Sequence, residues 1–221
     1  MKKLSLIVFV CSVFTLKAQI GITAGGSLLR PFGGNGVTYY GLGFGVEFAT
    51  DDQSTIYVNF SAGIPNSVSQ EFQLFANDFT TVPYNIATTG KITNNIYALE
   101  GGNRRYLIGD AFDYGFGLYG GTSYQVLICR AKVVTDGDYD RSLYTVHNSI
   151  GALPDVETVL SGGIGLHLGI KHQFARGVIF LESSVAYQIL PFSSSGGVIF
   201  MTDYSRLNFR TLLGYRKDIW N

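Results

Sequence analysis

The 221-residue chain has little cysteine, little charge and no long hydrophobic run beyond its N-terminus. Its two cysteines are Cys11 and Cys129, and only 14% of its residues are charged. Cys11 lies in an N-terminal segment that we expect to be removed, so the mature chain keeps one cysteine. One cysteine excludes an intrachain disulfide and a cysteine metal cluster. The lack of any later apolar run of about 18 residues excludes helical membrane spans.

Residues 1–18 have the layout of a secretory signal peptide. Lys2 and Lys3 form a basic start, and residues 4–16 form an apolar stretch too short to span a bilayer as a helix. Ala18 supplies a small residue at the expected cleavage point. The remaining residues, 19–221, suit a single domain.

The charge balance of this domain argues against a nucleic-acid partner. Without Lys2, Lys3 and Lys17, the 16 basic residues of the chain fall to 13, against 16 acidic residues. Binding to a phosphate backbone would instead favour a basic surface.

Several segments alternate between apolar residues and glycine or polar residues. Residues 40–48 and 160–171 are the clearest cases, and in both the interleaved positions include charged side chains. Successive side chains of a strand point to opposite faces, so each segment has one apolar face and one small or polar face. Charges on the second face are tolerated where that face lines a closed barrel whose outside meets lipid.

This pattern predicts an all-β fold, an eight-stranded antiparallel up-and-down transmembrane barrel. The fourth strand is the least regular, because Leu99 and Leu107 share a face with Arg105, so we leave open which of its faces points inward. The expected strands are 20–29, 37–49, 55–63, a segment within 91–108, 115–131, 156–174, 178–190 and 205–220.

The expected connections alternate in length. Three are short (49–54, 110–114 and 175–177) and three are long (64–92, 132–155 and 191–204). Outer-membrane barrels have short periplasmic turns and longer extracellular loops. The alternation therefore predicts a barrel in the outer membrane of a Gram-negative type of cell, with both termini in the periplasm.

The whole mature chain resembles the OmpA/OmpX-like superfamily of small outer-membrane β-barrels. The resemblance rests on the signal ending at residues 16–19, on the hairpin formed by 104–108 and 116–121, and on the final strand 207–215 followed by Trp220. It implies a fold and a cellular location, with outer-membrane lipid and lipopolysaccharide as surroundings, and it implies no particular activity.

The strand alternation places several charged residues inside the expected barrel, and both signs of charge occur among them. An eight-stranded barrel is barely wide enough to be filled by its own side chains. We therefore interpret these residues as a structural network of opposite charges, with a narrow passive pore for small solutes as the alternative. The residues are Glu47, Glu182, Lys171, Arg210 and His167.

The long connection 64–92 carries more aromatic groups than a solvated loop needs. Exposed apolar groups indicate a partner or a lid, so we list Phe72, Phe75, Phe79 and Tyr84 as candidate partner-binding residues. This favours a structural, scaffolding or partner-binding role in the cell envelope, with function carried by extracellular loops and another envelope protein complex as a possible partner.

Catalytic and metal-binding motifs are weak. His147 and Ser149, with Glu157 as an orienting acid, could serve a lipid A-modifying enzyme, but so short a motif arises readily by chance. Asp136 and its acidic neighbours at 138 and 140 resemble part of a calcium loop, but the glycine and glutamate of such a loop do not follow. We therefore expect neither an enzyme nor a cofactor or metal site.

Overall fold

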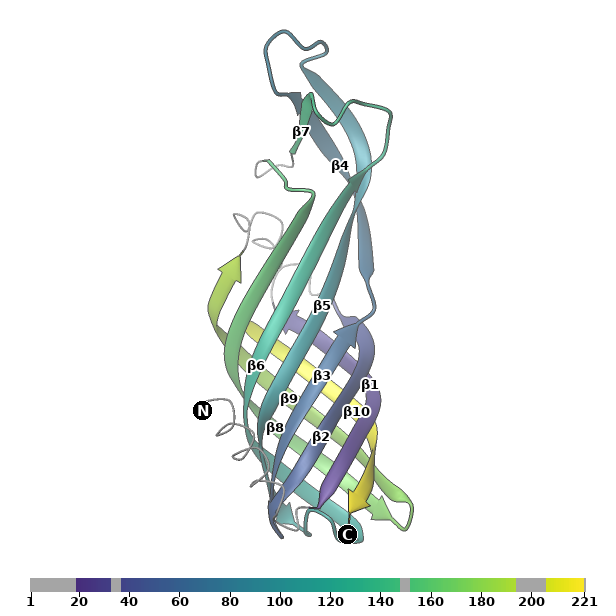
Figure 1. Cartoon of the computed structure of the whole chain (residues 1–221), viewed down its shortest axis with the longest axis vertical. Helices are drawn as coiled ribbons and strands as arrows, with labels where there is room; N and C mark the ends of the chain where they lie inside the picture. Colours follow the sequence, from purple (N-terminus) through teal and green to yellow (C-terminus); the bar gives the residue numbers. More distant parts are fainter. Residues whose placement is uncertain (1–18, 33–36, 148–151, 194–205, 221) are drawn as a thin grey trace, which may run out of the picture.

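The computed structural model describes residues 19–32, 37–147, 152–193 and 206–220, and nearly all of them lie in strands (Figure 1). No helix within these ranges is long and apolar enough to cross a membrane. The ten strands are β1 (Ile20–Phe32), β2 (Tyr39–Asp51), β3 (Ser54–Gly63), β4 (Asn66–Ala76), β5 (Asn85–Ile108), β6 (Gly115–Thr135), β7 (Tyr144–His147), β8 (Val156–Phe174), β9 (Gly177–Ser193) and β10 (Leu207–Trp220).

Eight of these strands close into an antiparallel barrel. Each strand pairs with its neighbours in the order β1, β2, β3, β5, β6, β8, β9 and β10, and β10 returns to β1 in register from Ile20↔Trp220 to Phe32↔Leu207. The expected fold class is thereby confirmed. The short turns lie at one end of the barrel, which we call the turn end; β1 begins and β10 ends there.

The alternating sequence separates two environments. Outward positions of the barrel strands are apolar and exposed, as in the run Ile164, Leu166, Leu168 and Ile170 on β8. The residues between them are small or buried, and His167 and Lys171 of β8 are both buried. On β5 the even positions point inward: Glu100 and Arg104 are buried, whereas Leu99, Arg105 and Leu107 are exposed. This settles the face that the sequence left open.

Two strands that the sequence did not predict, β4 and β7, lie beyond the barrel. The 24-residue strand β5 pairs through Tyr97–Arg105 with β3 and through Asn85–Asn94 with β4. Pro65 separates β3 from β4, and a proline cannot donate to a strand ladder. Strands β4 and β7, the first half of β5 and the end of β6 form a sheet that rises from the barrel, here called the extension (Figure 1).

The extension corrects two of the sequence predictions. Residues 64–92 were expected to be an irregular loop, but 66–76 and 85–92 form a hairpin with one buried face. Residues 132–155 were expected to be a polar loop, but β6 runs on to Thr135 and β7 pairs with β4. Phe72 packs with Ala131, Val133 and Leu153, so the extension has a small apolar core of its own.

The turn between β5 and β6 folds into the barrel. Ala111 and Phe112 are buried against Tyr106 and Tyr119, which closes much of the turn end. Gly109 and Gly115 bound the turn with φ values of 71° and 94°. This left-handed backbone conformation favours glycine, since other residues reach it only with strain.

Candidate functional site

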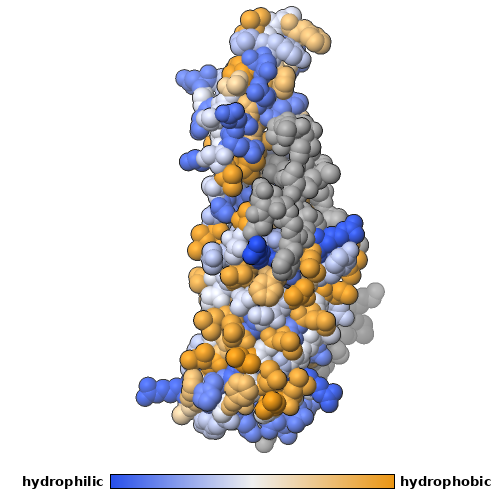
Figure 2. Space-filling view, turned by 180° about the vertical axis from the view of Figure 1, so that it is seen from behind, coloured by the Kyte–Doolittle hydropathy of each residue, from blue (hydrophilic) through white to orange (hydrophobic). Residues whose placement is uncertain are grey.

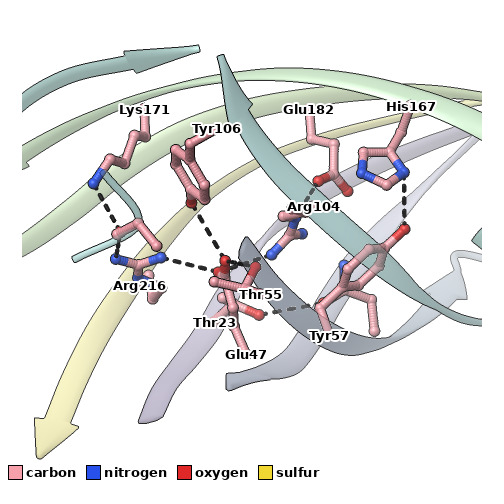
Figure 3. Close-up of polar contacts among 12 residues, drawn as sticks. Thr23, Glu47, Thr55, Tyr57, Arg104, Tyr106, His167, Lys171, Glu182 and Arg216 are labelled. Atoms are coloured by element: carbon pink, nitrogen blue, oxygen red, sulfur yellow. Dashed lines mark hydrogen bonds and ion pairs between the residues drawn. The ribbon is translucent and has the colours of Figure 1, made fainter. Parts of the chain in front are cut away.

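The turn-end half of the barrel holds a continuous series of buried ion pairs (Figure 3). Glu47 of β2 is its first acid: its carboxylate lies 2.8 Å from Arg104 Nη1 and 3.0 Å from Arg216 Nη1. Thr55 on the neighbouring strand β3 also donates a hydrogen bond of 2.7 Å to Glu47. One acid thus joins side chains from β2, β3, β5 and β10.

The series continues through two further acids. Arg104 Nε lies 2.7 Å from Glu182, and Arg210 Nη2 lies 3.0 Å from Glu182 and 2.9 Å from Glu100. Bases and acids therefore alternate in one connected series across the barrel interior, and we call this series the lumen ion-pair chain. In order, its members are Arg216, Glu47, Arg104, Glu182, Arg210 and Glu100.

An aromatic and a histidine complete the far end of this chain. The Tyr57 hydroxyl donates a hydrogen bond of 2.7 Å to Glu100 and lies 3.2 Å from His167 Nδ1. A hydroxyl has a single proton, so His167 Nδ1–H is the donor in the second contact. The Arg104 guanidinium lies 4.0 Å from the centre of the Tyr57 ring, in a cation–π contact.

Lys171 holds the inserted turn and does not take part in the ion-pair chain. Its ammonium donates to the carbonyl oxygens of Ala111 at 2.8 Å and Asp113 at 3.2 Å, and to the Gln173 side chain at 3.1 Å. Arg216 also donates to the Ala111 carbonyl, at 2.7 Å. These contacts fix the turn inside the barrel.

The charges of this region balance. Within the described residues, Glu47, Glu100, Glu182 and Asp218 face the cations Arg104, Arg210, Arg216 and Lys171. Burying a charge is costly unless an opposite charge and hydrogen bonds accompany it. The arrangement therefore offsets part of the cost of burying these charges by pairing acids with bases inside the barrel.

The lumen ion-pair chain does not continue into the half of the lumen nearer the extension, where Glu157 of β8 is buried. A middle layer carries small and amide side chains, and polar atoms of Ser61, Ser123, Ser161 and Asn208 lack a partner within the described part of the chain. Buried polar atoms of this kind usually bind water. Above them lies an apolar layer in which Leu29, Ile96, Leu127, Cys129 and Val159 are buried together.

The far end of the extension, residues 78–84, is the second candidate site and is here called the tip. Phe79 is 95% exposed and Val82 is 87% exposed. The Phe79 and Tyr84 rings are parallel, with centroids 6.2 Å apart, and Phe75 contacts both Tyr84 and His147. The connection between β4 and β5, which carries these side chains, lies at the end of the extension farthest from the barrel (Figure 1).

Hydrogen bonds fix the backbone of the tip. Asp78 Oδ1 accepts the backbone N–H and the hydroxyl of both Thr80 and Thr81, at 2.8–3.0 Å. The hydrogen bonds from Thr80 and Thr81 hold the pKa of Asp78 below its usual range. Tyr144 donates to the Pro83 carbonyl at 2.9 Å, which ties the tip to β7.

The structure separates the residues that the sequence singled out. Glu47, Glu182, Arg210 and His167 lie together in the lumen, and Lys171 lies beside the inserted turn. Of the candidate partner-binding residues, Phe79 and Tyr84 are exposed at the tip and Phe75 is half-buried. Phe72 is buried in the core of the extension, so its selection as an exposed residue was wrong.

Sequence reasoning gave no role to Tyr57 or to the inserted turn. Tyr57 shares its face with Thr55 and Asn59, so strand parity alone would have placed its hydroxyl inside. The turn offers no comparable pattern, because Ala111 and Phe112 are ordinary apolar residues in a segment without periodicity.

The remaining motifs are dispersed. His147 of β7 lies edge-on to the Phe75 ring of β4, and Glu157 is buried on β8, while Ser149 lies outside the described residues. Asp140 accepts hydrogen bonds from Ser142, and Asp136 accepts one from Thr89. Over residues 19–32, 37–147, 152–193 and 206–220, no three histidine, cysteine or acidic side chains cluster as a metal site would need.

Comparison with solved structures identifies the fold. The chain superposes on Neisserial surface protein A (NspA) with a TM-score of 0.53 and 9% identity, over 91% of this chain and 99% of that one. It superposes on the outer membrane protein OprG of Pseudomonas aeruginosa with a TM-score of 0.50 and 11% identity, over 92% of this chain and 97% of that one. No family model and no curated protein sequence matches the chain.

The chain therefore has the fold of the small eight-stranded outer-membrane β-barrels. The resemblance to OmpA/OmpX-like barrels drawn from the sequence is confirmed at the level of fold.

Proposed function

We propose that this protein is an integral outer-membrane barrel that presents a partner-binding extension at the cell surface. In this proposal the signal peptide is cleaved, both termini and the turn end lie in the periplasm, and lipid and lipopolysaccharide surround the barrel. The observation that carries the proposal is the contrast between a filled barrel and an extension with an exposed apolar tip.

The filling of the barrel supports a structural role for it. Arg104, Arg210, Arg216, Tyr57 and Tyr119 are among the largest fully buried side chains of the molecule, and all of them point into the lumen. The inserted turn and the apolar layer add to this filling on either side of the middle layer of small and amide side chains. A conducting pore would need a continuous hydrated path through this filled interior. We therefore rank a passive pore second, after the partner-binding role.

The tip supports a binding role. Exposed aromatic groups on a rigid support lose little conformational freedom on binding, which is why aromatic residues dominate binding hot spots. The fixed backbone around Asp78 supplies that rigidity at Phe79 and Val82. A partner protein in the cell envelope or at the cell surface fits such an apolar site better than a small polar ligand does.

A co-purification experiment with matched variants tests this proposal. The full chain is cross-linked in cells, extracted in detergent and compared with the variant Phe79→Ser/Val82→Ser/Tyr84→Ser. We expect the variant to keep its folded barrel and to lose any cross-linked partner. A variant with Ser67→Ala and Gln73→Ala on β4 leaves the tip intact and is expected to keep the partner.

The alternative is tested on the same samples. In planar bilayers, we expect the wild-type barrel to show no steady conductance. A steady conductance that increases when Arg104 or Arg210 is shortened would support the pore instead. Retention of the partner by the tip variant, together with such conductance, would overturn the proposed function.

A further inference from the structure

Basic side chains gather where the barrel meets the extension. On the outer face of β6, Tyr124, Val126 and Ile128 are exposed, and the next two outward positions are Arg130 and Lys132. The change from apolar to basic takes place in one step along the strand. On the neighbouring strand β5, Lys91 is likewise exposed, above the outward Leu99 and Tyr97.

The strand register places these three cations close enough together for their side chains to contact one bound ligand group. Lys132 pairs with Thr93 and Lys91 pairs with Val134, so Lys91 is the diagonal neighbour of Lys132 on the same face. Side chains two positions apart or diagonally opposed have Cβ atoms about 7–8 Å apart or somewhat closer, within reach of long side chains.

Hydroxyl groups lie on the same face beside the cations. The Ser67 and Thr93 hydroxyls are 2.9 Å apart, and Thr93 is the direct cross-strand partner of Lys132. Three acids border these cations: Asp155, whose carbonyl oxygen accepts the Val133 N–H at 2.9 Å, and, beside Lys91, Glu71 and Asp136. Glu71 pairs with Thr89, and the Thr89 hydroxyl donates to Asp136, so both lie about two positions from Lys91.

The patch formed by Lys91, Arg130, Lys132, Ser67 and Thr93, which we call the rim patch, is rich in hydrogen-bond donors. It is basic around Arg130 and Lys132, whose direct cross-strand partners are uncharged, and it is bordered by acids beside Lys91.

Further basic residues lie at the ends of two other barrel strands, opposite the turn end. Arg30 near the end of β1 and Arg206 just before β10 are both exposed. Figure 2 shows the corresponding change on one face of the molecule, with hydrophobic side chains gathered over the lower barrel and more hydrophilic ones above. On β6 the basic residues thus begin where the apolar outward residues end.

We infer that the rim patch binds phosphate groups of lipid in the outer leaflet, namely those of the lipid A part of lipopolysaccharide. Phosphates at this border lie level with the patch when the apolar band is in the hydrocarbon layer. Arginine and lysine form strong charge-assisted hydrogen bonds to phosphate. The inference rests on the proposed membrane placement, to which it adds a ligand and the residues that bind it.

The test uses the full mature chain refolded into three kinds of vesicle. The first contains bisphosphorylated lipid A, the second contains the same lipid without phosphates, and the third is phosphatidylcholine with inorganic pyrophosphate in solution. The readouts are the temperature at which the folded gel band is lost and the lipid A that remains bound after detergent exchange.

The test variant is Lys91→Gln/Arg130→Gln/Lys132→Gln. The matched control is Arg105→Gln/Arg176→Gln/Lys217→Gln, which removes three exposed cations at the turn end. We expect bound lipid A to fall roughly tenfold or more in the test variant, since each lost charge-assisted bond contributes measurably to binding. The control should retain it, and only phosphorylated lipid A should raise the melting temperature of the wild type.

The outcomes separate this inference from the proposed function. If the wild type folds in all vesicles but gains nothing from lipid phosphates, the rim patch has no such ligand while the membrane placement stands. Equal stabilisation by pyrophosphate would overturn lipid as the source of the phosphate. If the chain inserts into none of the vesicles, the proposed function itself fails.

Discussion

The barrel and the extension share strands β5 and β6 but follow different rules. In the barrel, outward residues such as Leu166 are apolar and inward residues such as Glu182 are small or paired. In the extension, the inner face holds a small apolar core around Phe72, and the outer face is polar. Continuous strands thus change their pattern where their surroundings change.

This difference indicates which residues serve the fold and which are available for binding. Every class of barrel position has a structural reason: contact with an apolar exterior, closure of the lumen or a tight turn. Phe79 and Val82 have none, since exposing apolar groups to water brings no stability. We therefore look for function at the tip and at the border between the two regions.

The largest expected effect comes from breaking the lumen ion-pair chain. Arg104→Ala leaves Glu47 and Glu182 each without one partner, and should lower the free energy of unfolding by about 3–5 kcal/mol. The neighbouring Arg105 is exposed, so Arg105→Ala should change the free energy of unfolding by less than about 0.5 kcal/mol. Urea unfolding of both variants in detergent micelles measures the difference; equal effects would contradict the assignment of faces on β5.

Arginine scanning compares the two outer surfaces. Leu166→Arg places a charge in the apolar band of the barrel and should destabilise it by about 2–4 kcal/mol in a bilayer. Val82→Arg at the tip should cost less than about 0.5 kcal/mol, because the site is hydrated. Unfolding in lipid vesicles is the measurement. If arginine is equally harmless at both positions, the barrel exterior does not face lipid.

A smaller effect is expected from two glycines of β8. A Cβ at Gly169 would lie 2.3 Å from Tyr119 Cζ, whereas a Cβ at Gly162 would meet no atom within 4 Å. Gly169→Ala should therefore cost about 1–3 kcal/mol through overpacking, and Gly162→Ala should be close to neutral. Thermal melts of the two variants decide; a reversed order would mean that Tyr119 does not cover Gly169.

The smallest effect on the barrel should follow from changing the tip. Replacing residues 78–83 by Asn-Gly removes Phe79 and Val82 without touching a barrel strand. We expect the free energy of unfolding to change by less than about 0.5 kcal/mol, because no lumen contact is lost. A large loss of stability, seen by the same thermal melts, would show that the extension supports the barrel.

The sequence predicted the barrel well because a single physical rule governs it. Alternation places Glu47 and Leu166 on opposite faces, and that rule holds along the strands of the ring apart from a few register shifts. It could not pair the charges, because which acid meets Arg104 depends on how strands distant in sequence curve around the lumen.

The strands of the extension were not predicted from the sequence, for a different reason. Residues 66–76 bury only one short face, and Phe72 and Leu74 are its two fully buried members. Two inward positions are too few to establish a period of two. Partner strand β7 is four residues long, so its pairing with Gln73–Ala76 left no readable pattern either.

Heat modifiability in lipid is the most direct test of the central claim that this chain is a membrane-embedded β-barrel. The mature chain, refolded into vesicles, should migrate on a gel as a compact band when unboiled and shift to its full apparent mass after boiling. A chain that stays monomeric in buffer without detergent, and migrates identically before and after boiling, would contradict the claim.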